Sequence, residues 1–133
     1  MIEYDFNRTD RIASVVGHNA DFLTNGTLYI PSSVEDNGIK YTVTEIADKA
    51  FAVWKELKRV TIPNTVTHIG KAAFSGCSSL EVTHFPDNVS FVTQIGDRAF
   101  GDCSQLRKSA IISSVQSIGE KAFGGCTKLE KAF

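Results

Sequence analysis

A six-residue pattern recurs four times along this chain and constrains its fold more than any other feature. The pattern reads Ile-x-x-x-Ala-Phe, and its copies end at Phe51, Phe74, Phe100 and Phe123. The phenylalanines are separated by 23, 26 and 23 residues. A period of about 20–50 residues is typical of proteins in which supersecondary units stack and bury their apolar faces only against their neighbours. The sequence therefore predicts a stacked repeat protein.

Further positions recur in step with the phenylalanines. A Leu lies six residues after each one, and a Cys lies three residues after each one except the first, where Trp54 takes its place. A Val, an Ile and a Pro recur between the Leu and the next Phe, so that the unit reads L-x-x-V-x-I-P-x-x-V-x-x-I-G-x-x-A-F-x-x-C-x-x-L. The recurring Leu and Cys residues are Leu57, Leu80, Leu106, Leu129, Cys77, Cys103 and Cys126.

The second copy shows which local structure the unit favours. Val60-Thr61-Ile62 alternates apolar and polar, which predicts a strand whose first and third side chains face inward. Pro63 ends that strand, because proline has no N–H for the ladder. Residues 66–69 predict a second short extended segment, and Gly70 permits a sharp turn after it. Residues 71–74 are interpreted as a single helical turn with Phe74 at the centre of the coil.

The repeated unit closely resembles the BspA-type leucine-rich repeat, which is found largely in bacterial and some protozoan surface proteins. The resemblance covers about residues 28–133. It implies a leucine-rich-repeat solenoid of the α/β type, with mostly short parallel β-strands and single helical turns. We therefore expect one repeat domain over residues 1–133, with about four coils in residues 28–133.

The two ends of the chain depart from the repeat. Residues 1–27 do not fit it, and the apolar segments 4–6 and 12–16 predict two strands of a β-hairpin that caps the N-terminal end of the core. At the other end the chain stops at Phe133, four residues into the next expected strand. This predicts an uncapped end that belongs to a longer array or pairs with another molecule.

Two coils contain additional residues. The first has nine more, roughly between Glu35 and Tyr41, and its Asp36-Asn37-Gly38 sequence predicts a small hairpin. The third has three more, near Val89-Ser90-Phe91. Insertions in repeats map to surface loops that often bind partners. Two interpretations of this loop are open: Phe91 is exposed for binding, or it folds back over a tolerated bulge.

Charge and hydropathy exclude two classes of partner. Fourteen Lys and Arg residues against fifteen Asp and Glu residues give a net charge of −1, so there is no basic excess to neutralise phosphates. No segment approaches the roughly 20 apolar residues of a membrane-spanning helix. The first residues also lack the basic and apolar segments of a secretory signal. We expect neither nucleic-acid binding nor membrane insertion.

The titratable residues give little indication of catalysis. Cys77 and His84 could form a nucleophile and base, but the recurrence of Cys77 at the same position of later coils favours a packing role. An odd number of cysteines without a CxxC pair is a poor disulfide framework and a poor zinc site. We expect free buried thiols, no catalytic residue, no metal and no cofactor, and therefore no enzyme.

Two further sets of polar residues are candidate ligand groups. Asp48, Asp97 and Glu120 share one position of the repeat and could form a carboxylate ladder for cations, but each is followed by Lys or Arg, which favours a solvated mixed-charge surface. His68 and His84 fall at outward positions that unrelated residue types fill in other coils. We expect both histidines to be solvent-exposed.

The strand face is the surface that we expect to bind. A row of parallel strands offers a broad, rigid sheet that suits protein ligands. Its predicted outward residues mix aromatic, apolar and basic groups, and Phe91 is added from the inserted loop. The candidate binding residues are Tyr29, Arg59, Thr61, Val82, His84, Lys108, Ala110 and Phe91.

The resemblance implies a biological setting for this face. BspA-like proteins are located at the cell surface, and members are associated with adhesion to host extracellular matrix proteins and with coaggregation. The expected function is a non-enzymatic cell-surface or secreted module for protein binding and adhesion. The alternative is that these coils are structural spacers in a longer surface array whose ligand site lies elsewhere.

Overall fold

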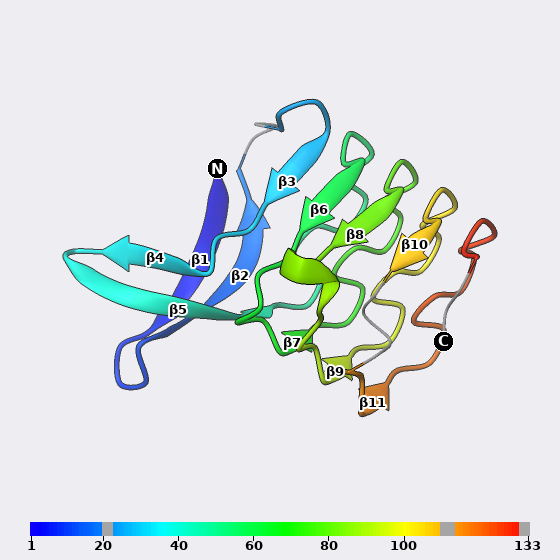
Figure 1. The fold of residues 1–133 in the computed structure, drawn as a ribbon. Coiled ribbons are helices and arrows are strands. Elements are labelled where there is room, and N and C mark those ends of the chain that lie inside the picture. The colour runs from blue at the N-terminus through cyan, green and yellow to red at the C-terminus, as the bar shows by residue number, and fades with distance from the viewer. Residues whose placement is uncertain (20–22, 110–113, 131–133) are drawn as a thin grey trace.

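The computed structural model describes residues 1–19, 23–109 and 114–130, and in these residues short strands and turns make up the fold (Figure 1). These residues contain no α-helix, and their only helix, a short 3-10 helix, is too short to cross a bilayer. The elements are β1 (Ile2–Asn7), β2 (Ile12–His18), β3 (Thr27–Tyr29), β4 (Ser33–Asp36), β5 (Ile39–Ile46), β6 (Arg59–Thr61), β7 (His68–Ile69), β8 (Val82–His84), the 3-10 helix η1 (Pro86–Asn88), β9 (Gln94–Ile95), β10 (Lys108–Ser109) and β11 (Ser117–Ile118).

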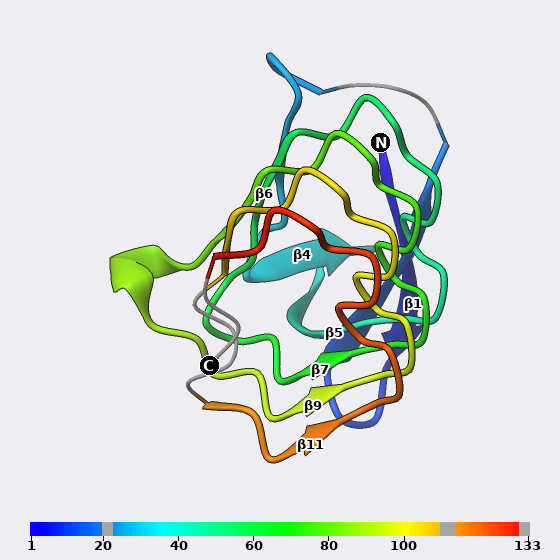
Figure 2. The same ribbon diagram turned by 90° about the vertical axis from the view of Figure 1, so that its right-hand side faces the viewer.

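The strands form two sheets in which equivalent segments of successive coils pair in parallel. One sheet has the order β3-β6-β8-β10. The other continues from β5 through β7 and β9 to β11. Figure 2 looks along the stack, where the coils appear as nested outlines and η1 stands out from them. The first strand of each coil thus lies beside the first strand of the next, as the 23-residue spacing predicts.

Turns rather than helices form the remaining side of each coil. The N–H groups of Phe51, Phe74 and Phe100 donate to the carbonyl oxygens of Ala73, Ala99 and Ala122 in the following coil at 2.7–2.8 Å. The predicted helical turn at residues 71–74 is therefore wrong. Ala72 has a φ of 55°, and this left-handed conformation interrupts any helix. Its equivalents in the other coils, Lys49, Arg98 and Lys121, share it.

The four repeated phenylalanines stack in one column through the core. Phe51, Phe74 and Phe100 are fully buried, and Phe123 is partly buried. Their ring centroids are 5.6, 5.2 and 5.3 Å apart along the series, and the last two pairs are parallel within 6°. Offset stacking at such distances adds to the burial of each ring. The recurring leucines Leu57, Leu80 and Leu106 are fully buried beside this column.

One hairpin precedes the first coil, and another lies within it. β1 and β2 pair antiparallel, and β2 pairs in parallel with β5, which extends the second sheet toward the N-terminus. β4 and β5 form the hairpin predicted from Asp36-Asn37-Gly38 (Figure 1). Asn37 and Gly38 both have positive φ angles, which are the conformations that an Asn-Gly hairpin turn needs. The additional residues of the first coil therefore form an ordered extension of the second sheet.

Candidate functional site

The strand face, which we define as the outward side of β3, β6, β8 and β10, carries two rows of aligned side chains. The strand register places Thr27, Arg59, Val82 and Lys108 in the first row, and Tyr29, Thr61 and His84 in the second. Arg59, His84 and Lys108 are exposed, Tyr29 is 67% exposed, and Thr61 and Val82 are half-buried. Of the predicted binding residues, Ala110 lies outside the described residues.

A buried row between these two holds the strand face in place. Leu28, Val60 and Thr83 align across β3, β6 and β8, and all three are buried. Beyond the second row, the side chains of Ile30, Ile62 and Phe85 also point into the core. The alternation that was read from Val60-Thr61-Ile62 therefore holds in the structure, and it fixes which side chains reach solvent.

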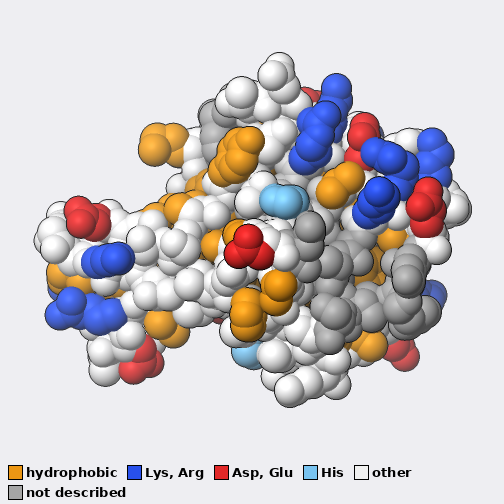
Figure 3. All heavy atoms as spheres, in the orientation of Figure 1, with side chains coloured by type: hydrophobic (Ala, Val, Ile, Leu, Met, Phe, Trp, Pro, Cys, Tyr) orange, Lys and Arg blue, Asp and Glu red, His pale blue; other side chains and the backbone are white. Residues whose placement is uncertain are grey.

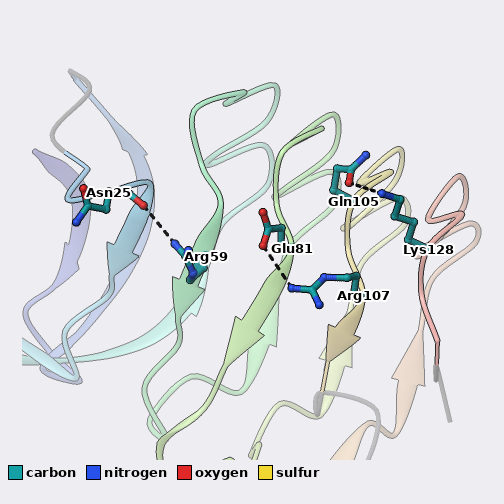
Figure 4. A network of polar contacts seen from close by, with 6 residues as sticks. All are labelled: Asn25, Arg59, Glu81, Gln105, Arg107 and Lys128. Atoms are coloured by element: carbon teal, nitrogen blue, oxygen red, sulfur yellow. Dashed lines mark hydrogen bonds and ion pairs between the residues drawn. The ribbon is translucent and has the colours of Figure 1, made fainter.

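Basic side chains gather on one part of the strand face. Figure 3 shows Lys and Arg residues in blue over the upper ends of β6, β8 and β10. Figure 4 shows how some of them are held: Arg59 donates from Nη1 to the carbonyl oxygen of Asn25 at 3.2 Å, and Arg107 forms an ion pair with Glu81 at 3.4 Å. Because both partners of that pair are exposed, it contributes little to stability. These contacts orient the cations at the surface.

The inserted loop leaves Phe91 accessible. Phe91 is 50% exposed and Val89 is also exposed, while Ser90 between them is buried. The Ser90 hydroxyl accepts a hydrogen bond from the Val92 N–H at 3.1 Å, which anchors the middle of the loop. Of the two interpretations made from the sequence, the structure supports an exposed Phe91 and not one folded back over the bulge. The repeat period could not predict whether Phe91 is exposed, because the inserted residues have no equivalent positions in the other coils.

The cysteines lie in the core and not in a reactive site. Cys77 and Cys103 are buried, and all three cysteines are free thiols. Each Sγ donates to the carbonyl oxygen of the preceding coil's phenylalanine, at 3.1, 3.1 and 3.0 Å for Cys77, Cys103 and Cys126. Burial raises the pKa of Cys77 to about 11, which opposes the thiolate that a nucleophile needs. His84 points outward from β8, so the structure does not bring it together with Cys77.

The burial of the Cys77 thiol predicts that the protein loses stability at alkaline pH. In the unfolded chain a cysteine ionises near its ordinary pKa of about 8.5, whereas Cys77 in the fold keeps its proton up to about pH 11. Between these values the unfolded state binds fewer protons, so the free energy of unfolding falls by about 1.4 kcal/mol per pH unit for this thiol. Urea unfolding of the parent chain and Cys77→Ala between pH 8 and 11 measures the difference. Identical pH slopes in the two proteins would contradict a buried neutral thiol.

A polar groove of about 300 Å³ lies along the second sheet, on a different side of the coils. It is lined by Glu45, His68, Gln94 and Lys71 together with several glycines. His68 is half-buried and shares a 2.8 Å hydrogen bond with the Thr67 hydroxyl, so the expectation that it is exposed was only partly correct. His84 is exposed as expected.

The acidic residues of this groove have structural partners. Asp48 Oδ1 accepts a hydrogen bond from the N–H of Lys71 at 2.8 Å, and Asp97 Oδ1 accepts one from the N–H of Glu120 at 2.9 Å. Each carboxylate thus links its coil to the next. Among the residues that the structure describes, no three His, Cys, Asp or Glu side chains converge as a metal site would require.

The family can now be assigned. The model for the BspA type leucine rich repeat region matches residues 25–133 in six copies. The chain belongs to the BspA-type leucine-rich repeat family. No curated protein sequence matches it. The BspA-type repeat identified from the columns of Phe, Leu and Cys is therefore confirmed, and its turns replace the helical turns that were expected.

Solved structures of bacterial leucine-rich repeat proteins have the same fold. A leucine rich cell surface protein from Faecalibacterium prausnitzii A2-165 is 35% identical with a TM-score of 0.86, over 95% of this chain and 33% of that one. A leucine-rich repeat protein from Bacteroides capillosus is 29% identical with a TM-score of 0.82, over 96% and 89% of the two chains. One from Bacteroides ovatus is 33% identical with a TM-score of 0.79, over 93% and 31%. This BspA-type chain thus spans about one third of the first and third structures.

Proposed function

We propose that this BspA-type chain is a non-enzymatic module that binds proteins through its strand face. The observation that carries the proposal is the aligned rows of Tyr29, Arg59, His84 and Lys108, exposed above a fully buried row. A rigid sheet that presents Tyr29 and Arg59 suits a protein partner, because Tyr and Arg are enriched at interface centres. Phe91 and Val89 add an exposed apolar edge from the inserted loop.

We further propose a role at the cell surface or outside the cell. Support comes from the F. prausnitzii protein, which is described as a leucine rich cell surface protein and is 35% identical over 95% of this chain. The family resemblance implies adhesion to host extracellular matrix proteins, and we propose a protein of this kind as the partner. None of the matched structures is described as an enzyme.

The proposed binding site is tested by substitutions on opposite sides of the coils. Arg59→Glu combined with His84→Ala is expected to weaken binding to immobilised, purified extracellular matrix proteins at least tenfold, about 1.4 kcal/mol. Arg98→Glu with His68→Ala makes the same chemical changes away from the strand face and serves as the control. Unchanged binding in the first variant would remove the strand face as the site and favour the spacer alternative.

We also propose that residues 1–27 cap a single domain whose repeats occupy residues 28–133. Support comes from the His18 ring, which stacks on Trp54 at a centroid distance of 3.7 Å and an interplanar angle of 10°, and from the buried Ala13 and Val15. Deleting residues 1–22 is expected to shift the fluorescence of this sole tryptophan to the red while far-UV circular dichroism is retained. Unchanged emission would contradict the capping role.

A further inference from the structure

We propose that the polar groove along the second sheet binds a neutral, N-acetylated saccharide, whose acetamido oxygen is held between the second and third coils. The groove crosses β5, β7, β9 and β11, on a different side of the coils from the strand face (Figure 1). Three observations support this second site: one break in the repeat, the hydrogen-bonding groups that the break leaves in the groove, and the charge of the groove.

A carboxylate joins neighbouring coils at one position of the repeat. Asp48 accepts a hydrogen bond from the Lys71 N–H at 2.8 Å, and Asp97 accepts one from the Glu120 N–H at 2.9 Å. In each case the acceptor lies in the coil before the donor, at the same position of the repeat. A carboxylate oxygen of the preceding coil is therefore the usual partner of this backbone N–H.

Lys71 breaks this pattern, because an ammonium group cannot accept a hydrogen bond. The N–H of Asp97, the next donor in the series, has no acceptor among the residues that the structure describes. The two coils are nevertheless joined at this point, since the Ala72 N–H donates to the Asp97 carbonyl oxygen at 2.9 Å. The substitution thus leaves one backbone donor without a partner inside a regular stack of coils.

The surroundings of Gly96 show the same difference. A Cβ atom at Gly70 would lie 2.5 Å from Oδ1 of Asp48, and the glycine of the fourth coil is close to the preceding aspartate in the same way. At Gly96 the three nearest atoms would instead be backbone atoms of Gly70 and Lys71. A ligand oxygen can therefore take, beside Gly96, the position that a carboxylate oxygen of the chain takes in the neighbouring coils.

The groups that line the groove here call for an acceptor without a proton. The Lys71 ammonium and the Gln94 amide line it, and within the described part of the chain neither side chain has a hydrogen bond or an ion pair. A carbonyl oxygen has two lone pairs and can accept from the Asp97 N–H and from a side-chain donor together. The acetamido group of an N-acetylated sugar supplies such an oxygen without a charge.

The charge of the groove disfavours an anionic ligand. Three carboxylates and one ammonium group line it, which gives a net charge of −2 when histidine is neutral. These groups belong to Glu45, Asp48, Asp97 and Lys71. A carboxylate or phosphate ligand would be repelled by this excess. The two isoleucines that line the groove, Ile69 and Ile95, are buried, so an apolar ligand finds little surface.

Hydroxyl groups suit the carboxylates of the groove. Asp48 and Asp97 each use Oδ1 for a backbone N–H, and Glu45 uses Oε1 for the Ser14 hydroxyl at 2.8 Å. The second oxygen of each carboxylate can accept from a ligand, because an ionised carboxylate is an acceptor only. A sugar ring carries several adjacent hydroxyls, and the groove volume of about 300 Å³ is at the lower end for small-molecule sites.

An extended peptide fits the groove less well. Peptides that add to a sheet pair with free backbone groups at its edge. In this groove the N–H groups of Gly70, Gly96 and Gly119 already donate to the preceding coil at 2.7–2.8 Å. The groove thus offers side chains and one isolated backbone donor rather than the edge that a peptide needs.

A ¹H–¹⁵N NMR titration of the full chain with N-acetylglucosamine and with N-acetylgalactosamine tests the proposal. We expect at least one of them to shift the Asp97 amide signal in a saturable way. Glucose and galactose lack the acetamido group and are expected to bind about tenfold more weakly, the effect of losing a hydrogen bond to a charged or buried donor. An acetylated and amidated Gly-Ser-Gly peptide offers neutral carbonyl groups without the sugar hydroxyls and is expected to bind at least as weakly.

Lys71→Asp is the decisive variant, because it restores the carboxylate of the repeat. We expect hydrogen exchange at the Asp97 N–H to slow, the protein to remain folded, and sugar affinity to fall at least tenfold. Lys55→Asp makes the same chemical change at an exposed position that does not line the groove, and it should leave the affinity within twofold.

Four outcomes would overturn the proposal: no shift of the Asp97 amide with either N-acetylated sugar, equal binding of the sugars without the acetamido group, equal binding of the peptide, or unchanged sugar affinity in Lys71→Asp. Arg59→Glu with His84→Ala, which alters the strand face, should leave sugar affinity within twofold. A failure of this site and a failure of the proposed protein-binding face are therefore distinguishable.

Discussion

Replacing Phe74 with alanine is expected to lower the free energy of unfolding by about 3–5 kcal/mol, measured by urea denaturation. Phe74 is fully buried, and its ring lies 5.6 Å from that of Phe51 and 5.2 Å from that of Phe100. Its removal leaves a cavity between two neighbouring coils and takes away one member of the ring column. The loss of buried area and the cavity act together, since the backbone hydrogen bonds between coils limit collapse around the site.

The matched control is a phenylalanine outside the column. Phe91 is half-exposed on the inserted loop, so Phe91→Ala is expected to change stability by less than about 1 kcal/mol. Comparable losses for the two substitutions would contradict the arrangement of the core. The same Phe91→Ala protein also tests, in the binding assay, whether the exposed loop contributes to the strand face.

Replacing Gly96 with alanine is expected to destabilise the chain by about 3 kcal/mol. A Cβ atom at this position would lie 2.6 Å from the backbone nitrogen of Lys71 and 2.8 Å from the carbonyl carbon of Gly70. Because both atoms belong to the backbone of the preceding coil, no side-chain movement can relieve the contact, and the two coils must separate. Thermal or urea unfolding measures the effect.

Ala47 provides the control for this substitution. It occupies the equivalent position in the first coil, where its N–H donates to Val15 of the hairpin rather than to another repeat coil. Ala47→Gly is expected to change stability by no more than about 1 kcal/mol. If Gly96→Ala proved as stable as the parent chain, the close approach of the second and third coils at Gly96 would be contradicted.

The repeat period accounts for most of what could be predicted about the fold. The alignment of Phe51, Phe74, Phe100 and Phe123 follows directly from their spacing, because stacked coils bring equivalent residues together. The Asn37-Gly38 turn was also predictable, since few other residue pairs adopt two successive positive φ angles easily. The spacing determines the structure in the first case, and the residue type determines it in the second.

The turns could not be predicted in this way. Lys49, Ala72, Arg98 and Lys121 have no side-chain preference for a left-handed backbone, so a reading of local propensity favours a helical turn at these positions. Hydrogen bonds between coils, such as that from the Phe74 N–H to the Ala99 carbonyl, impose the conformation instead. Such long-range contacts are absent from any local sequence pattern.

The sequence could predict which strand residues of the candidate site point outward, but not the hydrogen bonds that these residues form. The alternation of inward and outward side chains along each strand placed Tyr29, Thr61 and His84 on one side of the strands. The strand register aligns these three residues in one row. The hydrogen bond from Arg59 to the carbonyl oxygen of Asn25 was missed, because it joins residues 34 positions apart through a turn. Thr83 also lies at a buried position that its polar side chain did not suggest.

The register of successive coils is the central claim, because it forms the phenylalanine column and also places Arg59, Val82 and Lys108 in one row. Nuclear Overhauser effects between aromatic ring protons test it most directly. We predict cross-peaks between Phe51 and Phe74, between Phe74 and Phe100 and between Phe100 and Phe123, whose ring centroids lie 5.2–5.6 Å apart. An absence of cross-peaks between these pairs, in a folded and fully assigned chain, would contradict it.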